Sequence, residues 1–204
     1  MKQKELMRYS RHIMLPEIDI IGQEKLANSK VSIIGLGGLG SPCSIYMAAS
    51  GVGNLNLFDD DKVELSNLQR QIIFNSADLG EEKSSVAKDK LLNLNENIIC
   101  NSHSIRVNEG NINNLLEGSD CVIDCSDNFE TRKAINKYCF ETKKSLISGA
   151  CIGWQGQIFI LRFSCEDSPC YECLFEDIEE EDLSCRESSI FSPLAGLIGT
   201  YLAI

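Results

Sequence analysis

The chain has 204 residues, a formal net charge of −11 and ten cysteines. This length suits a single domain, residues 1–204, with a substantial core, and the acidic charge without any basic arm argues against a nucleic-acid partner. The opening residues lack the apolar stretch of a secretory signal. We therefore expect a cytoplasmic protein with no membrane partner, whose cysteines are mostly reduced and buried.

The apolar pattern alternates between helical and strand periods along the chain. In the first half it predicts helical segments over 1–12 and 17–27, a strand over 31–34, a helix over 41–50, a strand over 54–58 and a helix over 83–95. In the second half it predicts a strand over 98–107, a short helix over 112–116, a strand over 120–125, a helix over 130–142, strands over 145–150 and 157–163, and a buried helix over 193–204.

Strands that alternate with helices form βαβ units. The predicted fold class is therefore α/β, Rossmann-like, with a mainly parallel sheet and helices on both faces. Ligands of such sheets bind beyond the carboxyl ends of the strands. Chemistry is expected in the loops after Ile34, Phe58 and Cys125.

The stretch IIGLGGLGSP joins the first strand to the following helix. Its glycines, Gly35, Gly37, Gly38 and Gly40, let backbone N–H groups approach a phosphate closely at a helix N-terminus. Three of them fit the dinucleotide pattern G-x-G-x-x-G. The turn predicts an anionic ligand, and the phosphates of NAD and of ATP fit it equally. A tight strand–helix turn without any ligand is the simpler alternative.

Asp59 ends the second strand, nineteen residues after Gly40. A carboxylate at this place accepts hydrogen bonds from ribose hydroxyls. Asp60 and Asp61 stand beside it, so a solvated acidic loop is the alternative. Because NAD and ATP both contain ribose, Asp59 does not discriminate between them.

The residues downstream do discriminate. The segment SNLQRQ brings amide donors and Arg70, whose planar guanidinium suits phosphate oxygens, although a surface position also explains it. Lys83 starts a helix, where a cation opposes the helix dipole, so local stability does not account for it. Asp127 follows the fourth strand and is suited to Mg²⁺, although Asp127 or Asn128 can also cap the next helix. Together these groups indicate a clamp for the phosphates of ATP, which hydride transfer does not need.

The sequence resembles the MoeB/ThiF/HesA group, bacterial relatives of the ubiquitin-activating enzymes, over essentially its whole length. The resemblance is carried by RYSRHI, GLGGLGSP, the Asp59–Asp61 strand end, SNLQRQ, LGEEK, DCSDN, QGQI, CYECL and SCRESSIFSPLAGLIG. It implies an adenylyltransferase that uses ATP and Mg²⁺ to activate the C-terminal Gly-Gly carboxylate of a ubiquitin-like sulfur-carrier protein (MoaD- or ThiS-like).

The resemblance also implies roles for individual residues. Catalytic roles fall to Arg11, Arg70, Lys83 and Asp127, with Arg11 reaching the ATP of the neighbouring subunit in a homodimer. Nucleotide contacts fall to Gly35, Gly37, Gly38, Gly40, Asp59, Asp61, Asn67, Arg70, Lys83, Asp127 and Asn128, and Asp127 positions Mg²⁺. A separate sulfur donor, such as a cysteine desulfurase or a rhodanese-like protein, then converts the acyl-adenylate to a thiocarboxylate.

Two cysteine features stand apart from this site. Cys170 and Cys173 have the spacing of half a structural Cys₄ zinc site. In the family the second pair lies further toward the C-terminus, so we expect the protein to continue beyond Ile204. Cys185 matches a position where some relatives carry a cysteine that bonds to the carrier or to sulfur. The acidic run before it raises the pKa of such a thiol, and a chemical role and a passive one stay open.

Two other functions remain as alternatives. An NAD-dependent oxidoreductase explains the glycines and Asp59 but leaves Arg70, Lys83 and Asp127 without a shared purpose. A nucleotide-binding scaffold without activity is the other alternative. The sequence does not choose between molybdopterin, thiamin and another thio-cofactor as the product of the pathway, because the carrier-facing surfaces that distinguish these pathways carry no readable motif.

Overall fold

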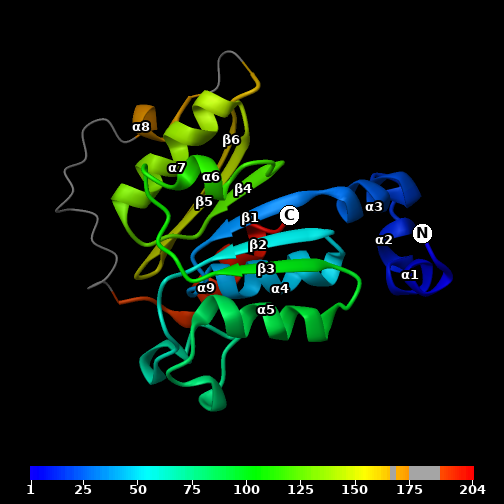
Figure 1. Ribbon diagram of the computed structural model, residues 1–204, viewed down its shortest axis with the longest axis horizontal. Helices are drawn as coiled ribbons and strands as arrows, with labels where there is room; N and C mark the ends of the chain where they lie inside the picture. Colours follow the sequence, from blue (N-terminus) through cyan, green and yellow to red (C-terminus); the bar gives the residue numbers. More distant parts are fainter. Residues whose placement is uncertain (166–168, 175–188) are drawn as a thin grey trace.

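The computed structural model describes residues 1–165, 169–174 and 189–204 (Figure 1). Six strands in these ranges form one sheet in the order β3-β2-β1-β4-β5-β6. All neighbouring strands are parallel except the last pair, β5 and β6. The strands are β1 (Lys30–Ile34), β2 (Asn54–Phe58), β3 (Ile99–His103), β4 (Cys121–Asp124), β5 (Ser145–Ile152) and β6 (Gln155–Arg162). The predicted α/β class with a mainly parallel sheet is confirmed.

Helices cover both faces of the sheet, and each face has its own core (Figure 1). One face carries α4 (Gly40–Ser50), α5 (Lys83–Leu94) and α9 (Ser192–Tyr201), and the other carries α6 (Ile112–Leu115), α7 (Phe129–Thr142) and α8 (Tyr171–Leu174). Leu36, Leu91 and Ala195 belong to the first core, and Ile135 and Tyr138 to the second. The central strands are buried on both sides, which explains their continuous apolar runs.

Three helices precede the sheet and lie at its amino-terminal edge, namely α1 (Gln3–Arg8), α2 (Ser10–Ile13) and α3 (Asp19–Asn28) (Figure 1). The helical segment predicted over 1–12 is divided at Tyr9, whose ring is buried against Gly51. Asn95 Nδ2 donates to Tyr9 Oη over 2.8 Å and to the Ala48 carbonyl oxygen over 2.7 Å. This contact fixes α1 and α2 to the first core.

Two predicted boundaries differ from the structure. The strand predicted over 98–107 ends at His103, because its partner β2 ends at Phe58 and offers no further strand to pair with. The helix predicted as buried over 193–204 buries one face only: Ala195 and Leu202 are fully enclosed, while Leu197 and Tyr201 are more than half exposed. Two 3₁₀ turns, Leu65–Asn67 and Ser76–Asp78, lie in a stretch that had no predicted element.

The chain reverses its direction of winding at β1, which lies between β2 and β4. In a doubly wound sheet the crevice for a ligand forms at this point. Gly35 has φ +87°, and a Cβ there would lie 2.7 Å from the Cys125 carbonyl oxygen. A Cβ on Gly40 would lie 1.9 Å from the Gly35 carbonyl oxygen. The glycines therefore allow the start of α4 to approach the end of β1.

Gly40→Ala is expected to lower the free energy of unfolding by about 1–3 kcal/mol, because the added methyl group meets backbone atoms that cannot move aside. Gly196→Ala is the matched control, since a Cβ there meets nothing within 4 Å and α9 gains about 0.4–1 kcal/mol. Urea unfolding measures both. Equal midpoints for the two variants would contradict this account of the turn.

Candidate active site

A cavity of about 910 Å³ lies beyond the carboxyl ends of β1, β2, β4 and β5. Its walls include ten of the residues predicted from the sequence: Gly35, Gly37, Gly38, Asp59, Asp61, Asn67, Arg70, Lys83, Asp127 and Asn128. Gly40 stands outside this described lining and packs beneath the turn instead. Segments far apart in the sequence therefore meet in one place, as the fold class predicted.

Asp59 ties the glycine turn to the end of β2. Its Oδ2 accepts from the backbone N–H of Leu36 over 2.7 Å, and its Oδ1 accepts from the backbone N–H of Asp61 over 2.9 Å. Burial raises the pKa of Asp59, and the nearby Lys83 ammonium opposes part of this rise. A carboxylate has about four acceptor positions. The two that remain are available to hydroxyl groups of a ligand.

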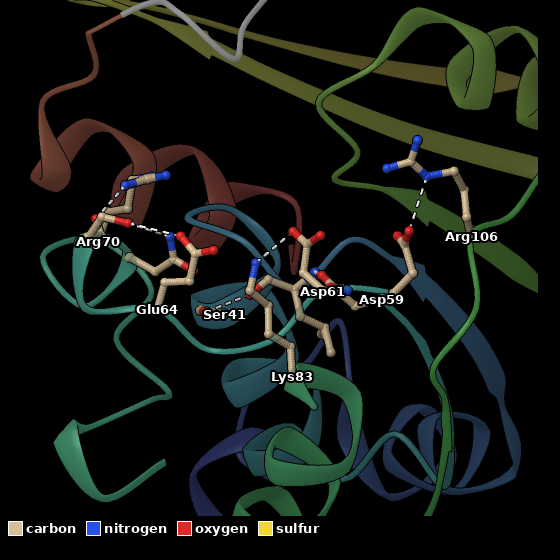
Figure 2. A network of polar contacts seen from close by, with 11 residues as sticks. Ser41, Asp59, Asp61, Glu64, Arg70, Lys83 and Arg106 are labelled. Carbon is tan, nitrogen blue, oxygen red and sulfur yellow. Dashed lines mark hydrogen bonds and ion pairs between the residues drawn. The ribbon is translucent and has the colours of Figure 1, made fainter. Parts of the chain in front are cut away.

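Lys83 is the first residue of α5, and only 5% of its side chain is exposed. Its Nζ contacts Asp61 Oδ2 over 2.9 Å, and the Asp61 side chain is 60% exposed (Figure 2). An ammonium group carries three donors, so this contact leaves capacity for an anion in the cavity. From the sequence, a lysine at this place is not expected to stabilise the helix. Its burial in the cavity agrees with a role toward a ligand.

Arg70 lies along the glycine turn (Figure 2). A Cβ on Gly38 would lie 3.4 Å from both Cγ and Cδ of Arg70, so the missing side chain makes room for the stem. Its Nη1 donates to the Ser66 carbonyl oxygen over 3.1 Å.

On the other side of the site Arg106 Nε contacts Asp60 Oδ2 over 3.2 Å. Arg106 also lines the cavity, and the sequence analysis did not single it out.

Two amide side chains in the cavity wall have buried oxygens without a hydrogen-bond partner among the described residues, Asn67 Oδ1 and Gln71 Oε1. Burying such an oxygen unpaired costs about 1–3 kcal/mol, so both atoms indicate a place that a ligand or its water completes. Asn67 was predicted as a phosphate contact, which is a role for its Nδ2 group, because the unpaired Oδ1 accepts and needs a donor such as a hydroxyl or a water. Gln71 was missed, although it closes the SNLQRQ motif and lies one helical turn after Asn67.

The DCSDN segment contains two carboxylates with different surroundings. Asp124 is 1% exposed and accepts hydrogen bonds from Ser126, Arg132 and Ser148. Asp127 is exposed, lines the cavity and makes no hydrogen bond or ion pair with any residue that the structure describes. Of these two carboxylates, Asp127 is therefore the one whose oxygens are available for a metal ion.

Asn128 serves the local structure as well as the cavity. Its Oδ1 accepts from the backbone N–H of Thr131 over 2.9 Å, which caps α7. Asn128 therefore caps the helix and also lines the cavity beside Asp127, so the structural and the ligand-facing position are compatible.

Three predicted residues lie away from the cavity. Arg11 is exposed on α2, at the opposite edge of the sheet (Figure 1). Cys170 Sγ and Cys173 Sγ are 3.1 Å apart. Burial raises the pKa of Cys170, but hydrogen bonds from Cys173, Asn136 and Glu172 together outweigh it, so the pKa is lowered. Within the described ranges no group of three or more His, Cys, Asp or Glu side chains is arranged for a metal ion. Cys185 lies outside the described residues.

None of the helices in the described part of the chain combines the length and hydropathy needed to cross a bilayer. Of the cysteines whose apolar surroundings in the sequence predicted burial, Cys125 and Cys151 are enclosed in the first core, whereas Cys121 is only partly buried.

Comparison with known proteins gives a consistent result. The model of the ThiF family matches residues 9–204. The whole chain is 41% identical to the sulfur carrier protein ThiS adenylyltransferase of Escherichia coli and 40% identical to the molybdopterin-synthase adenylyltransferase of the same organism, covering 81% and 82% of those proteins. The crystal structure of E. coli MccB with AMPCPP and MccA superposes with a TM-score of 0.80 at 28% identity, over 96% of this chain. The chain spans 61% of the length of that MccB chain.

The raised pKa of Asp59 has a consequence for stability. The folded protein binds the proton of this carboxyl more tightly than the unfolded chain does, so the contribution of Asp59 to stability falls as the pH rises from 3.8 through the raised value. Asp59→Asn removes this dependence. Urea unfolding between about pH 4 and pH 7 is expected to show wild type losing stability relative to the variant as the pH rises.

Asp60→Asn is the control for this experiment, because it removes the neighbouring carboxylate and leaves Asp59 and its backbone contacts in place. This control should keep the dependence that Asp59 produces. If the stabilities of wild type and Asp59→Asn change with pH in parallel, the Asp59 carboxyl has the same pKa in the folded and unfolded states.

Proposed function

The chain belongs to the ThiF family, and from this premise we propose that it adenylylates the C-terminal Gly-Gly carboxylate of a small ubiquitin-like sulfur-carrier protein. The carboxylate oxygen attacks the α-phosphorus of ATP, the bond from that phosphorus to the bridging oxygen breaks, and pyrophosphate leaves. The product is an acyl-adenylate. The adenylyltransferase relatives at about 40% identity over the whole chain support this reaction rather than hydride transfer to NAD.

One observation in the structure carries the proposal. Two cationic side chains, Lys83 and Arg70, line the same cavity as the glycine turn and as Asp127, whose carboxylate has no hydrogen bond or ion pair among the described residues. Cationic donors and a free carboxylate suit a polyphosphate with a divalent cation, whereas hydride transfer at a nicotinamide ring requires neither. Asp59 supplies the acceptor for ribose, and Asn67 supplies an amide for a phosphate.

The available oxygens of Asp127 fit Mg²⁺, which prefers one or two protein carboxylates together with phosphate oxygens. When bound, Mg²⁺ neutralises charge on the phosphates that leave. Asp124 does not fit this role, because Arg132, Ser148 and Ser126 already occupy its oxygens.

The reaction needs no general base, because the attacking carboxylate is already ionised at neutral pH. Consistent with this, neither histidine is part of the described cavity lining. His12 contacts Gln23 over 3.1 Å, and His103 stacks on Phe58 with ring centroids 4.7 Å apart. The side chains of the site therefore contribute positioning and charge neutralisation, which dominate phosphoryl-type transfers.

The proposal includes a homodimer in which Arg11 completes the site of the partner. Arg11 and the cavity occupy opposite edges of the sheet in one chain, so only a second copy can bring them together. The helices around Arg11 also expose large apolar side chains, which suits a contact surface: Met7, Met14, Leu15, Ile20 and Ile21.

Further partners follow from the chemistry. A sulfur donor, such as a cysteine desulfurase or a rhodanese-like protein, brings a persulfide whose terminal sulfur attacks the acyl carbon and displaces AMP, which gives an acyl disulfide. A further thiol then reduces this acyl disulfide, so that the thiocarboxylate is released and the thiol ends in a disulfide. Cys170 and Cys173 contribute two thiolates to a zinc site that needs a second pair of ligands. The use of ATP and reduced thiols suits the cytoplasm. Since the ThiS and molybdopterin-synthase relatives are equally similar, either a thiamin or a molybdopterin carrier is a fitting substrate.

ATP–pyrophosphate exchange that depends on an added carrier tests the function. Arg70→Ala and Asp127→Ala are expected to lower the exchange rate about 10²–10³-fold, because each removes a group that stabilises charge as the phosphates separate. Arg162→Ala is the control, since Arg162 in β6 pairs with Ser145, the first residue of β5, at the end of the sheet that lies away from the cavity. Normal exchange by either site variant, or exchange without any carrier, would refute the proposal.

Mixing two inactive variants tests the role of Arg11. If Arg11 acts in the partner's site, a dimer of Arg11→Ala with Arg70→Ala has one complete site and one site with both defects. After subunit exchange, an equal mixture is expected to recover about one quarter of wild-type exchange, while each variant alone stays inactive. A mixture as inactive as its components would show that Arg11 does not act in the partner's site.

A further inference from the structure

A cluster of three buried polar side chains lies beneath the loop that carries Asp127. Asp124, Arg132 and Ser148 are 1%, 6% and 0% exposed. Arg132 Nη1 contacts Asp124 Oδ2 over 3.2 Å and Ser148 Oγ over 3.0 Å, and Ser148 Oγ donates to Asp124 Oδ2 over 2.7 Å. The cluster joins the end of β4, the first turns of α7 and the middle of β5.

The same cluster holds the backbone on both sides of the cavity floor. Arg132 Nη2 donates to the Gly149 carbonyl oxygen over 2.8 Å and to the Ser126 carbonyl oxygen. Asp124 Oδ1 accepts from the Ser126 backbone N–H over 3.0 Å and from its hydroxyl over 2.6 Å. Ser126 is thus held through its N–H, its hydroxyl and its carbonyl oxygen, one residue before Asp127.

The four contacts of the two Nη atoms occupy four of the five N–H groups of the guanidinium. Although Arg132 borders the cavity, its donors point to protein groups rather than to a ligand. A buried ion pair of this kind often contributes no more to stability than apolar side chains of the same size. A gain in stability therefore does not explain why these three polar side chains are buried together. Their hold on the loop at Ser126 does explain it.

We propose that Arg132 is a positioning residue for Asp127. With Asp124 and Ser148 it holds Ser126 so that the Asp127 carboxylate, which makes no hydrogen bond or ion pair with the described residues, meets Mg²⁺ on the bound nucleotide. The inference rests on the proposed function, because it takes Asp127 as the metal ligand. Groups that orient a metal ligand typically change metal affinity by about 10–100-fold when they are removed.

Titration calorimetry with ATP, in excess Mg²⁺ and in EDTA, tests the inference without any carrier protein. Arg132→Lys keeps the charge opposite Asp124 but cannot reach all four acceptors. It is expected to reduce the Mg²⁺-dependent gain in ATP affinity about tenfold and to keep the affinity in EDTA within about twofold of wild type. Lys137→Gln is the control, since Lys137 lies on the same helix and pairs with Glu109 at the surface over 3.2 Å. It should match wild type in both titrations.

A double-mutant cycle shows whether Arg132 acts through Asp127. Asp127→Asn should remove the Mg²⁺-dependent gain, and adding Arg132→Lys should remove nothing further. Ser148→Ala keeps Arg132 and its other three contacts, loses the two contacts of the Ser148 hydroxyl, and should cause a smaller loss of the same gain. It also replaces Arg132→Lys should that variant fail to fold.

Three results would overturn the inference. They are an unchanged Mg²⁺-dependent gain in Arg132→Lys or Ser148→Ala, equal losses with and without Mg²⁺, and a wild-type affinity that Mg²⁺ does not improve. Failure of the proposed function is seen separately, as an absence of carrier-dependent exchange in the wild type, because the binding measurement needs no carrier.

Discussion

The close approach of α4 to the end of β1 is the constraint on which the site depends. Gly35 and Gly40 leave no room for a Cβ, since either would meet a backbone carbonyl group at less than 3 Å. The turn between them is then fixed from the side by Asp59, which accepts from the Leu36 N–H. Because this turn brings β1, β2 and β4 to one crevice, every other group of the site is placed relative to it.

The protein is strongly acidic, whereas the described cavity lining has five basic and five acidic side chains: Lys62, Arg70, Lys83, Arg106 and Arg132 against Asp59, Asp60, Asp61, Glu64 and Asp127. Lys83, Arg70 and Arg106 each already contact an oxygen of the protein. For Lys83 and Arg106 these oxygens belong to Asp61 and Asp60, which hold the cations in place in the absence of an anion. A polyphosphate would meet preorganised charges in a partly enclosed space, where electrostatic interactions are stronger than in water. The overall charge therefore says little about the site.

Much of the site could be predicted, because its parts follow the ends of strands that their apolar runs reveal. Asp59 and Asp127 were placed in this way, and Lys83 was recognised because a cation at a helix start lacks a local reason. Gln71 and Arg132 were missed, because their importance depends on contacts that form only in the folded chain. The buried Asp124 was the available signal for Arg132, since a carboxylate inside a strand requires a counter-ion. The position of Arg11 has no explanation within one chain, so no pattern in the residues alone could assign it.

The two carboxylates of DCSDN show how one short segment divides two tasks. Asp124 is buried in β4, where Arg132 and the hydroxyls of Ser126 and Ser148 hydrogen-bond to its oxygens. These oxygens therefore stabilise the structure and are not available to a ligand. Asp127 follows three residues later, beyond the strand, where the chain has turned toward the cavity and the carboxylate keeps its oxygens. A ligand for a divalent cation must be both unoccupied and fixed, and a single residue cannot easily be both. If Asp127 holds Mg²⁺ as proposed, the segment meets both needs, because the buried Asp124 fixes the loop that presents the exposed Asp127.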